Sequence, residues 1–338
     1  MPHQQSSIAL LALVAAAALT PHAAAQKILS CADVECPIIP AGGRVAKCTV
    51  ADKTFEMVGI SQIDVGDNDN LAGLSWTKAV TAKDKEDNGK KTREFEQLFY
   101  LGTPLGFRTD GMRACALFFN KVSDRVKFGN DTTPVEIGQG TCGDAMTSNC
   151  VNAILERAKS VDLSGFRDTD DACERLEKEF EDNLDAACQS FATGSKWVDV
   201  EAEGSDDDDD DDDAPQPIVG DRNSTSNCWP TSTKSNDLRL VYDRDEDGDF
   251  LAGTANKNFF GITPVLTVFF PRNGTNSTSS AITSVEAQLT CVKAIDLNTA
   301  LRDSLSSGND ESAASGPNAG VLGIWAGLAA VVLAVILG

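Results

Sequence analysis

Ten cysteines constrain this chain more than any other feature of its sequence. Their number is even, and the N-terminal signal described below directs the chain to an oxidising compartment, where disulfides form and persist. We therefore expect five disulfides among Cys31, Cys36, Cys48, Cys115, Cys142, Cys150, Cys173, Cys188, Cys228 and Cys291. A zinc site is the alternative, but the sequence has no Cys-x-x-Cys pair and no histidine after residue 22.

Residues 1–25 have the pattern of a cleaved secretory signal peptide. Ile8–Leu19 is an unbroken apolar run that is too short to cross a bilayer, and Ala23-Ala24-Ala25 follows it. Small residues at positions −3 and −1 suit signal peptidase, so cleavage is expected after Ala25. The segment departs from the usual pattern in one respect, because no Lys or Arg precedes the apolar run.

The other end of the sequence has the order of a glycosylphosphatidylinositol (GPI) attachment signal. Residues 321–338 are apolar, a polar spacer precedes them, and a cluster of small residues stands before the spacer. This order predicts replacement of the tail by a lipid anchor, at Ser307, Gly308 or Asn309. A transmembrane helix is the alternative, but it usually carries Lys or Arg on its cytoplasmic side, and none follows here.

The residues between the two signals are acidic and rich in glycosylation sequons. The formal net charge is −22, and nucleic acid is not an expected partner because its binding needs a basic face. Asn-x-Ser/Thr sequons in polar stretches predict N-linked glycans at Asn130, Asn223, Asn273 and Asn276. About 280 residues remain, enough for one large or two small domains.

Residues 26–141 are predicted to form a first β segment. Leu74, Trp76 and Val80 fall on one parity of a period-2 run. Asn88-Gly89 then predicts a two-residue hairpin turn, because both residues tolerate positive φ.

Four more runs predict strands, two before and two after the middle of the chain. They are Glu94–Leu101, the buried apolar run Ala114–Phe119, Pro264–Phe270, and the stretch Ser284–Ile295. In the last stretch, alternation places Val285, Ala287, Leu289 and Cys291 inward, and Glu286, Gln288 and Thr290 outward. A further strand is expected to place Leu238, Leu240 and Tyr242 on one face.

In residues 142–192 the spacing of apolar residues changes to the period of a helix. Apolar residues recur at helical spacing in Cys150–Val161 and in Ala172–Ala192, which predicts a disulfide-linked helical hairpin. Asp168 or Thr169 is expected to cap the second helix.

Helix geometry limits how the cysteines of this hairpin can pair. Cys173 and Cys188 would be about 22 Å apart along one helix, which is too far for a bond. Two sets remain, Cys142–Cys188 with Cys150–Cys173, or Cys142–Cys173 with Cys150–Cys188. We favour the first set, because Cys142 and Cys188 are separated from the loop between the helices by similar numbers of residues.

Residues 193–227 are predicted to be an acidic linker. Asp206–Asp213 places eight carboxylates within about 28 Å of extended chain, and neighbours closer than a screening length of about 8 Å repel one another. Pro215 and Pro217 stiffen the chain further. A diffuse attraction of cations or of a basic partner, and a defined calcium site, are the lower-ranked alternatives.

The predicted fold class is therefore mainly β, with an α-helical insertion and disulfide staples. We expect one antiparallel β-sandwich assembled from residues 26–141 and 228–296, with the hairpin 142–192 and the linker inserted between its halves. Two separate domains joined by the linker are the alternative. Residues 297–320 are predicted to form a stalk that leads to the anchor.

Catalytic motifs are scarce. Both histidines, His3 and His22, lie in the predicted signal peptide, so the secreted chain lacks the histidine of a Ser-His-Asp or Cys-His centre. The sequence also lacks the P-loop and dinucleotide-binding fingerprints. Glycoside hydrolysis by two carboxylates stays open, but no pair stands out among 51 acidic residues. We assign no catalytic residue, and the balance favours a protein that is not an enzyme.

Calcium is the one metal that the sequence suggests. The candidate ligands are Asp243, Asp245, Asp247 and Asp249. With Gly248, the first three match positions 1, 3, 5 and 6 of a calcium loop, but position 12 is Thr254 instead of Glu. An acidic β-turn is the alternative, and any calcium affinity should be weak.

The arrangement of the two ends resembles GPI-anchored cell-surface glycoproteins of filamentous fungi. The Ala-rich signal that ends at Ala25, the Ser/Thr clusters and the apolar tail from Val321 carry this resemblance. It implies residence at the outer face of the plasma membrane or in the cell wall, and it implies no reaction. The outer leaflet is then a partner through the anchor, with wall polysaccharide or other surface proteins as further candidates.

Three functions from different classes follow. The leading hypothesis is a non-catalytic surface glycoprotein with a structural, adhesive or wall-organising role. The second is a carboxylate-dependent cell-wall glycosidase or transglycosylase, and the third is a weakly calcium-dependent adhesin.

Overall fold

The computed structural model describes residues 27–31, 33–34, 38–41, 44–50, 53–66, 68–87, 89–104, 106–109, 111–205, 237–272 and 282–296. The predicted signal peptide, the Asp206–Asp213 run, the stalk and the apolar tail lie outside these residues. The same is true of Cys36, Cys228, Asn223, Asn273, Asn276, Ser307, Gly308 and Asn309. Within the described ranges, no helix is long and apolar enough to cross a membrane.

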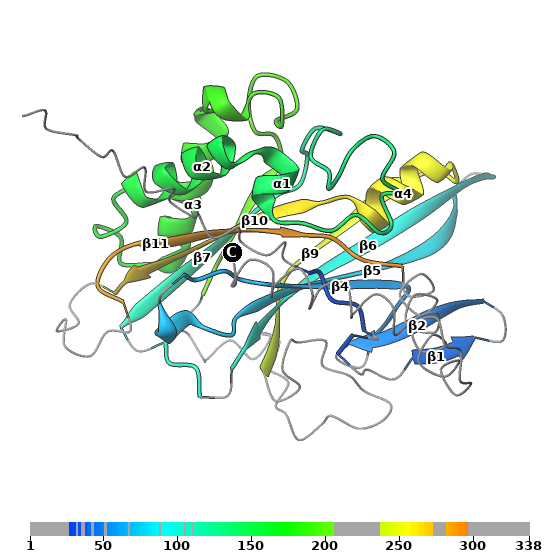
Figure 1. Cartoon of the computed structure of the whole chain (residues 1–338), viewed down its shortest axis with the longest axis horizontal. Helices are drawn as coiled ribbons and strands as arrows, with labels where there is room; N and C mark the ends of the chain where they lie inside the picture. Colours follow the sequence, from blue (N-terminus) through cyan, green and yellow to red (C-terminus); the bar gives the residue numbers. More distant parts are fainter. Residues whose placement is uncertain are drawn as a thin grey trace, which may run out of the picture.

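Two antiparallel sheets packed face to face form the centre of the fold (Figure 1). Sheet I has the order β4 (Met57–Gln62), β5 (Ser75–Asp87), β6 (Lys90–Thr103) and β9 (Asp237–Gly248). Sheet II has the order β11 (Glu286–Val292), β10 (Thr263–Pro271), β7 (Met112–Phe119) and β8 (Val200–Gly204). Both sheets contain strands from both sides of the Asp206–Asp213 run. The predicted mainly β, antiparallel fold class is confirmed.

Helices and a small third sheet cover the outer faces of this sandwich. Sheet II is covered by α1 (Cys142–Met146), α2 (Ser148–Ser160) and α3 (Thr169–Asp182), which lie above it in Figure 1. The third sheet consists of β1 (Ile38–Ala41), β2 (Arg44–Val50) and β3 (Lys53–Phe55), and sheet I is partly covered by the N-terminal segment, by Val50 of β2 and by Phe55 of β3. The remaining short elements are η1 (Asp69–Leu71), η2 (Ala186–Cys188) and α4 (Ala252–Phe260), of which α4 packs against β5 and β9.

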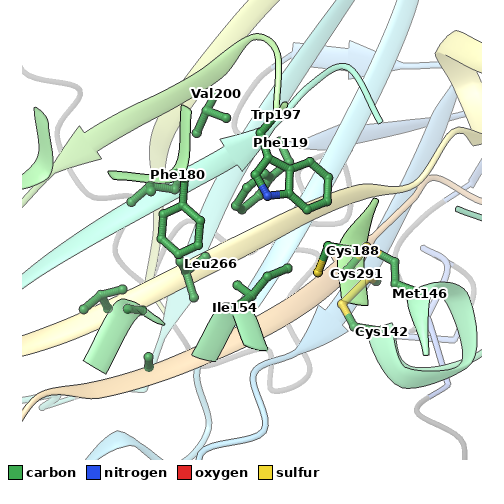
Figure 2. Packing of buried hydrophobic residues seen from close by; sticks show 14 of the residues in the cluster. Phe119, Cys142, Met146, Ile154, Phe180, Cys188, Trp197, Val200, Leu266 and Cys291 are labelled. Carbon is green, nitrogen blue, oxygen red and sulfur yellow. A yellow bond between two sulfur atoms is a disulfide. The ribbon is translucent and has the colours of Figure 1, made fainter. Parts of the chain in front are cut away.

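Sheet II is the middle layer, so its central strands are buried on both faces. In β10, Leu266 and Val268 pack against the helices, whereas Val265 and Phe269 pack against sheet I. Figure 2 shows the helical side of this layer, where Leu266 lies among aromatic and aliphatic side chains. Burial on both faces explains why β7 and β10 are mostly apolar and show no alternation of apolar and polar residues.

The same layering corrects one prediction for β11. Ala287, Leu289 and Cys291 face the helices, as the alternation predicts. Thr290, predicted to point outward, is only 2% exposed. It shares the face of Val292, which packs against sheet I, so this face is covered by protein and not by water.

Aromatic residues fill the space between the two sheets. Trp76 of β5 meets Phe118 of β7 edge to face, with ring centroids 5.5 Å apart. The Trp76 indole Nε1 donates a hydrogen bond of 3.0 Å to Thr267 Oγ1 of β10, so the buried indole is satisfied across the sandwich. Leu74, Trp76 and Val80 are all buried, as their shared parity predicts.

A bulge in β9 overturns the prediction that Leu238, Leu240 and Tyr242 share a face. Leu240 pairs with Tyr100, whereas Tyr242 pairs with Phe99, so one extra residue of β9 is inserted between them. The insertion reverses the parity of the strand. Tyr242 therefore lies between the two sheets, while Leu238 and Leu240 pack on the outer face of sheet I.

The hairpin prediction is confirmed. Asp87 of β5 pairs with Lys90 of β6, which leaves a two-residue loop, and Gly89 adopts a φ of 79°. A glycine meets this positive φ without a side-chain clash.

The second helix is shorter than predicted. It is capped by Asp168, whose side chain accepts from Asp170 N, but it ends at Asp182 and not at Ala192. The chain then turns back through η2, because Cys188 is bonded to Cys150 on α2. A helix that continued to residue 192 would carry Cys188 away from its partner.

The disulfides tie the helical insertion to sheet II, and the favoured pairing set is wrong. The bonds are Cys115–Cys173, Cys142–Cys291 and Cys150–Cys188. Only Cys150–Cys188 belongs to either predicted set, because both sets assumed that the hairpin cysteines pair among themselves. Cys31 is also disulfide-bonded, and the described part of the chain contains no free cysteine.

Among the three disulfides of the described residues, loss of the one with the longest range should cost the most stability. The Cys142–Cys291 bond joins residues separated by 149 positions, against 38 for Cys150–Cys188. By loop-closure entropy, the double substitution C142A/C291A should lower the free energy of unfolding by about 5 kcal/mol, and C150A/C188A by about 4 kcal/mol. Guanidinium unfolding of the two variants measures both values. A larger loss in C150A/C188A would contradict the expectation.

Candidate functional site

The candidate calcium ligands lie on a strand and not in a loop. Asp243, Asp245 and Asp247 belong to β9 and pair with residues of β6. Alternate residues of a strand are about 7 Å apart and project in parallel, so they do not wrap around one cation. Asp249 lies beyond the strand, where it accepts from Leu251 N. The loop conformation that the calcium prediction required is thus not formed by these residues.

Lysines already neutralise much of this acidic strand face. Lys85 of β5 forms ion pairs with Glu94 of β6 and with Asp247, the latter at 3.7 Å. Burial raises the pKa of Asp245, and the negative charges of Glu94 and Glu96 raise it further. Across the described ranges, no group of three or more His, Cys, Asp or Glu side chains is placed to hold a metal ion.

Only one predicted glycan acceptor can be placed. Asn130 is exposed in the loop between β7 and α1. The hydroxyl of Thr132, the third residue of its sequon, donates a 2.7 Å hydrogen bond to Asn130 Oδ1. The acceptor amide is therefore accessible.

A cavity that sequence reasoning did not anticipate lies beside this loop. Its volume is about 440 Å³, and it is enclosed by sheet I, α4, the start of β10 and the loop between β7 and α1. Five basic residues line it, against two acidic ones. We call it the cationic cavity, and its basic residues are Lys78, Lys127, Arg244, Lys257 and Lys293.

Lys78 is the most deeply buried of these cations. It stands in the middle of β5, on the parity of Trp76, and is 2% exposed. Its Nζ donates to the carbonyl of Gly261 at 3.1 Å and to Thr263 Oγ1 at 3.0 Å. Burial, together with the positive charges of Arg244 and Lys293, lowers the pKa of Lys78 to about 7.

Lys293 approaches the cavity from the chain that follows β11. It is 1% exposed, and its Nζ donates to the carbonyls of Val135 and Gly138. Burial lowers its pKa to about 8, while the charge of Glu136 acts in the opposite direction. Its backbone is held against β4, where a Cβ on Gly59 would lie 1.8 Å from the Lys293 carbonyl oxygen.

Arg244 is the only one of the three central cations with carboxylate partners in the described ranges. It forms ion pairs with Glu246, which also lines the cavity, and with Asp199 at 3.5 Å. The contacts of Lys78 and Lys293 are to neutral oxygens alone. A buried ammonium with neutral partners keeps much of its desolvation cost, so these two lysines are placed to gain from an added negative charge.

Neutral polar groups complete the wall of the cavity. Asn120 donates from Nδ2 to the Tyr242 hydroxyl at 2.9 Å, while its Oδ1 is buried and has no hydrogen-bond partner in the described chain. Gln97 and Asn258 are joined by a 3.3 Å hydrogen bond. The cavity therefore presents cations beside hydrogen-bonding groups, as expected of a site for an anion that also carries hydroxyl or amino groups.

The sequence contained one signal for this site. Lys78 has the parity of Leu74, Trp76 and Val80, so the pattern that predicts an inward-facing strand also predicts a lysine inside the protein. For Arg244 and Lys293 there is no such signal, because only the tertiary fold brings them beside Lys78.

A second cavity, of about 310 Å³, lies between α3 and β8 and has the opposite charge. It is lined by Asp170, Asp171, Glu174, Glu177 and Glu203. Burial raises the pKa of Glu177.

The buried amine of Lys78 should leave a pH signature on stability. Its pKa is lowered by folding, so between pH 7 and 10 the unfolded state binds more protons and stability rises with pH. From pH 7 to 9, the free energy of unfolding of the wild type should rise relative to that of Lys78→Met, by at most about 1.4 kcal/mol per pH unit. Denaturant unfolding at each pH measures this difference. Parallel curves for wild type and Lys78→Met would contradict it, and Lys196→Met, an exposed site, is the control.

Comparison of the chain with protein-family models, with curated proteins and with solved structures finds no match.

Proposed function

We propose that this protein is a GPI-anchored surface glycoprotein that binds a small anionic ligand in the cationic cavity without transforming it. One observation carries the proposal. Two lysines, Lys78 and Lys293, are buried beside a cavity of about 440 Å³, and their hydrogen-bond partners among the described residues are neutral, in a chain whose net charge is −22. The chain is rich in carboxylates that could pair with these lysines, and yet no carboxylate of the described residues forms an ion pair with either one.

An anion in the cavity would supply the missing countercharge. Desolvation has already taken place in the folded protein, so a carboxylate or phosphate gains attraction to both amines without a further cost of burying them. The effective dielectric constant is low in such a site, and charge-assisted hydrogen bonds there are strong. Binding should therefore depend on charge more than on apolar contact.

The rest of the lining narrows the class of ligand. Gln97, Asn120 and Asn258 offer amide donors and acceptors that suit hydroxyl groups. Phe260 and Ile262 add an apolar surface. A sugar acid, free or at the end of a polysaccharide chain, combines these properties, and it agrees with an adhesive or wall-organising role.

The proposed location rests on other features. The N-terminal signal, the sequons and the apolar tail predict export and lipid anchoring. The three described disulfides agree with an oxidising compartment. The exposure of Asn130 agrees with glycosylation.

A second candidate function is glycoside hydrolysis, which one observation favours. Asp124 and Glu246 line the same cavity, and two carboxylates are the minimum that such an enzyme needs. Release of reducing sugar from an acidic oligosaccharide, abolished by Glu246→Gln, would favour this function over simple binding.

Anion binding should be selective and should weaken as pH rises. Calorimetric titration of the purified protein with glucuronate should show binding, whereas glucose should bind much more weakly. An anion favours the protonated lysines, so affinity should fall between pH 6 and 9 as Lys78 and Lys293, with pKa values of about 7 and 8, lose their protons.

Variants test where the anion binds. Lys293→Met should lower the affinity at least tenfold, since it removes one buried charge-assisted hydrogen bond of about 1.5–3 kcal/mol. Lys196→Met should leave the affinity unchanged. Equal binding of glucose and glucuronate would refute the anion site.

The anchor has its own test. Treatment of intact cells with phosphatidylinositol-specific phospholipase C should release the protein into the medium, because the enzyme cuts the lipid and leaves the chain intact. A triple substitution of Ser307, Gly308 and Asn309 by bulky residues should prevent surface attachment. Retention of the wild type on the cells after treatment would favour a transmembrane helix or a covalent link to the wall.

A further inference from the structure

We propose that Lys78 is a covalent capture site, whose amine condenses with the carbonyl group of a small oxo acid to form an imine in the cationic cavity. An oxo acid carries both an aldehyde or ketone and a carboxylate. The inference rests on the proposed anion site, because that site would hold the carboxylate while Lys78 reacts with the carbonyl.

The hydrogen bonds of Lys78 match a neutral amine. A neutral amine has two N–H donors and a lone pair, whereas an ammonium has three donors and no lone pair. Two acceptors surround Lys78 Nζ in the described chain, the Gly261 carbonyl at 3.1 Å and Thr263 Oγ1 at 3.0 Å. Both N–H groups are then satisfied, and the lone pair is left for the cavity that Lys78 lines.

The acceptors are fixed in place by the backbone. Gly261 ends α4, where its N–H donates to the Lys257 carbonyl at 2.9 Å. A Cβ on Gly261 would lie 2.2 Å from that same oxygen, so only glycine fits and the Gly261 carbonyl is held toward β5. Thr263 is the first residue of β10. The amine is thus held by two rigid elements, as a nucleophile requires.

The charges around Lys78 favour the reactive, unprotonated form. Arg244 and Lys293 are the charges that act on it most, and both are positive. The acidic residues of the cavity are Asp124 and Glu246, and Glu246 is engaged by Arg244. Lys127 and Lys257 add positive charge to the lining. One contact favours the ammonium, the face of the Phe99 ring, whose centroid lies 5.5 Å from Nζ.

The same cations that activate the amine can hold the ligand. A carboxylate between Arg244 and Lys293 would place an adjoining carbonyl carbon in the cavity that Lys78 lines. Lys293 is a poorer nucleophile than Lys78, because Glu136 favours its ammonium. This arrangement of a desolvated amine beside other cations is one of the recognised ways to activate a lysine.

The reaction balances without a further reagent. The Nζ lone pair attacks the carbonyl carbon, a C–N bond forms, and the C=O π pair moves to oxygen. The oxygen takes up a proton as the nitrogen loses one, which gives a carbinolamine. The C–O bond then breaks, the hydroxyl leaves as water with a proton taken from solvent, the nitrogen lone pair completes the C=N bond, and the nitrogen returns its remaining proton to solvent. No oxidant or reductant is consumed, and hydrolysis releases the ligand unchanged.

Reductive trapping tests this inference on the purified full-length protein. Incubation with glyoxylate and cyanoborohydride converts an imine to a stable carboxymethyl-lysine, which peptide mass spectrometry locates. At pH 7 we expect Lys78 to be modified at least roughly tenfold faster than exposed lysines such as Lys196, because a lysine with an ordinary pKa is almost fully protonated there. Glycolate, which has the carboxylate but no carbonyl, should slow the modification.

The controls separate this inference from the proposed function. Lys78→Arg should abolish the modification at position 78 and leave that of other lysines unchanged, whereas Lys196→Arg should leave Lys78 modification intact. The wild-type rate should also rise with pH around 7, a measurement that needs no variant. Modification of Lys78 no faster than that of exposed lysines would overturn the inference.

Two further outcomes distinguish capture from anion binding. If calorimetry shows that glyoxylate and glucuronate bind but Lys78 is not trapped, the capture inference fails and the anion site stands. If propanal, which has no charge, modifies Lys78 while no carboxylate binds, the amine is reactive, but the anion site and the capture of an oxo acid both fail.

Discussion

Burial of β10 on both faces is the constraint on which the rest of the structure depends. This strand pairs with β7 on one side and β11 on the other, and its two faces support the helices and sheet I. A strand in this position has no solvated side, so every residue from Thr263 to Phe270 is buried. Its start also supplies Thr263, one of the two hydrogen-bond partners of Lys78. The order of the layers and the hydrogen bonding of Lys78 in the cavity thus both depend on β10.

Local patterns in the sequence were sufficient to predict individual turns, helix caps and strands. They were not sufficient to predict how these elements are layered in the fold. The Asn88-Gly89 turn and the Asp168 cap depend on neighbouring residues, and both are confirmed. The prediction that Thr290 points outward was wrong. Alternation of apolar and polar residues shows that the two faces of a strand differ, but it does not show whether water or protein covers each face. The assignment of Tyr242 failed at a bulge, which one inserted residue produces without changing composition. The cysteine pairing failed because spacing along a helix cannot reveal bonds to a strand far along the chain.

The functional site shows the same limit. Lys78 was visible as a charged residue in an inward-facing series, whereas Arg244 and Lys293 join it only through the pairing of distant strands. Because these three side chains lie close together, positive charge is concentrated inside an acidic protein. Screening confines the field of the outer carboxylates to about 8 Å at physiological salt, so an anion inside the cavity responds mainly to the lysines and to Arg244. A protein can therefore repel anions at a distance and still hold one within.

The Cys142–Cys291 bond also has a mechanical meaning. A pull on the chain after Asp296, as a membrane tether would apply, acts first on the Ile295–Val58 bridge and then on β11. Peeling of β11 from β10 stops at Cys291, because its sulfur is bonded to α1. Residues 142–291 therefore behave as a closed loop that force cannot lengthen unless the disulfide breaks. Tension is passed through the bond to α1, whereas Lys293 and the Ile295–Val58 bridge lie outside the closed loop and bear the load first.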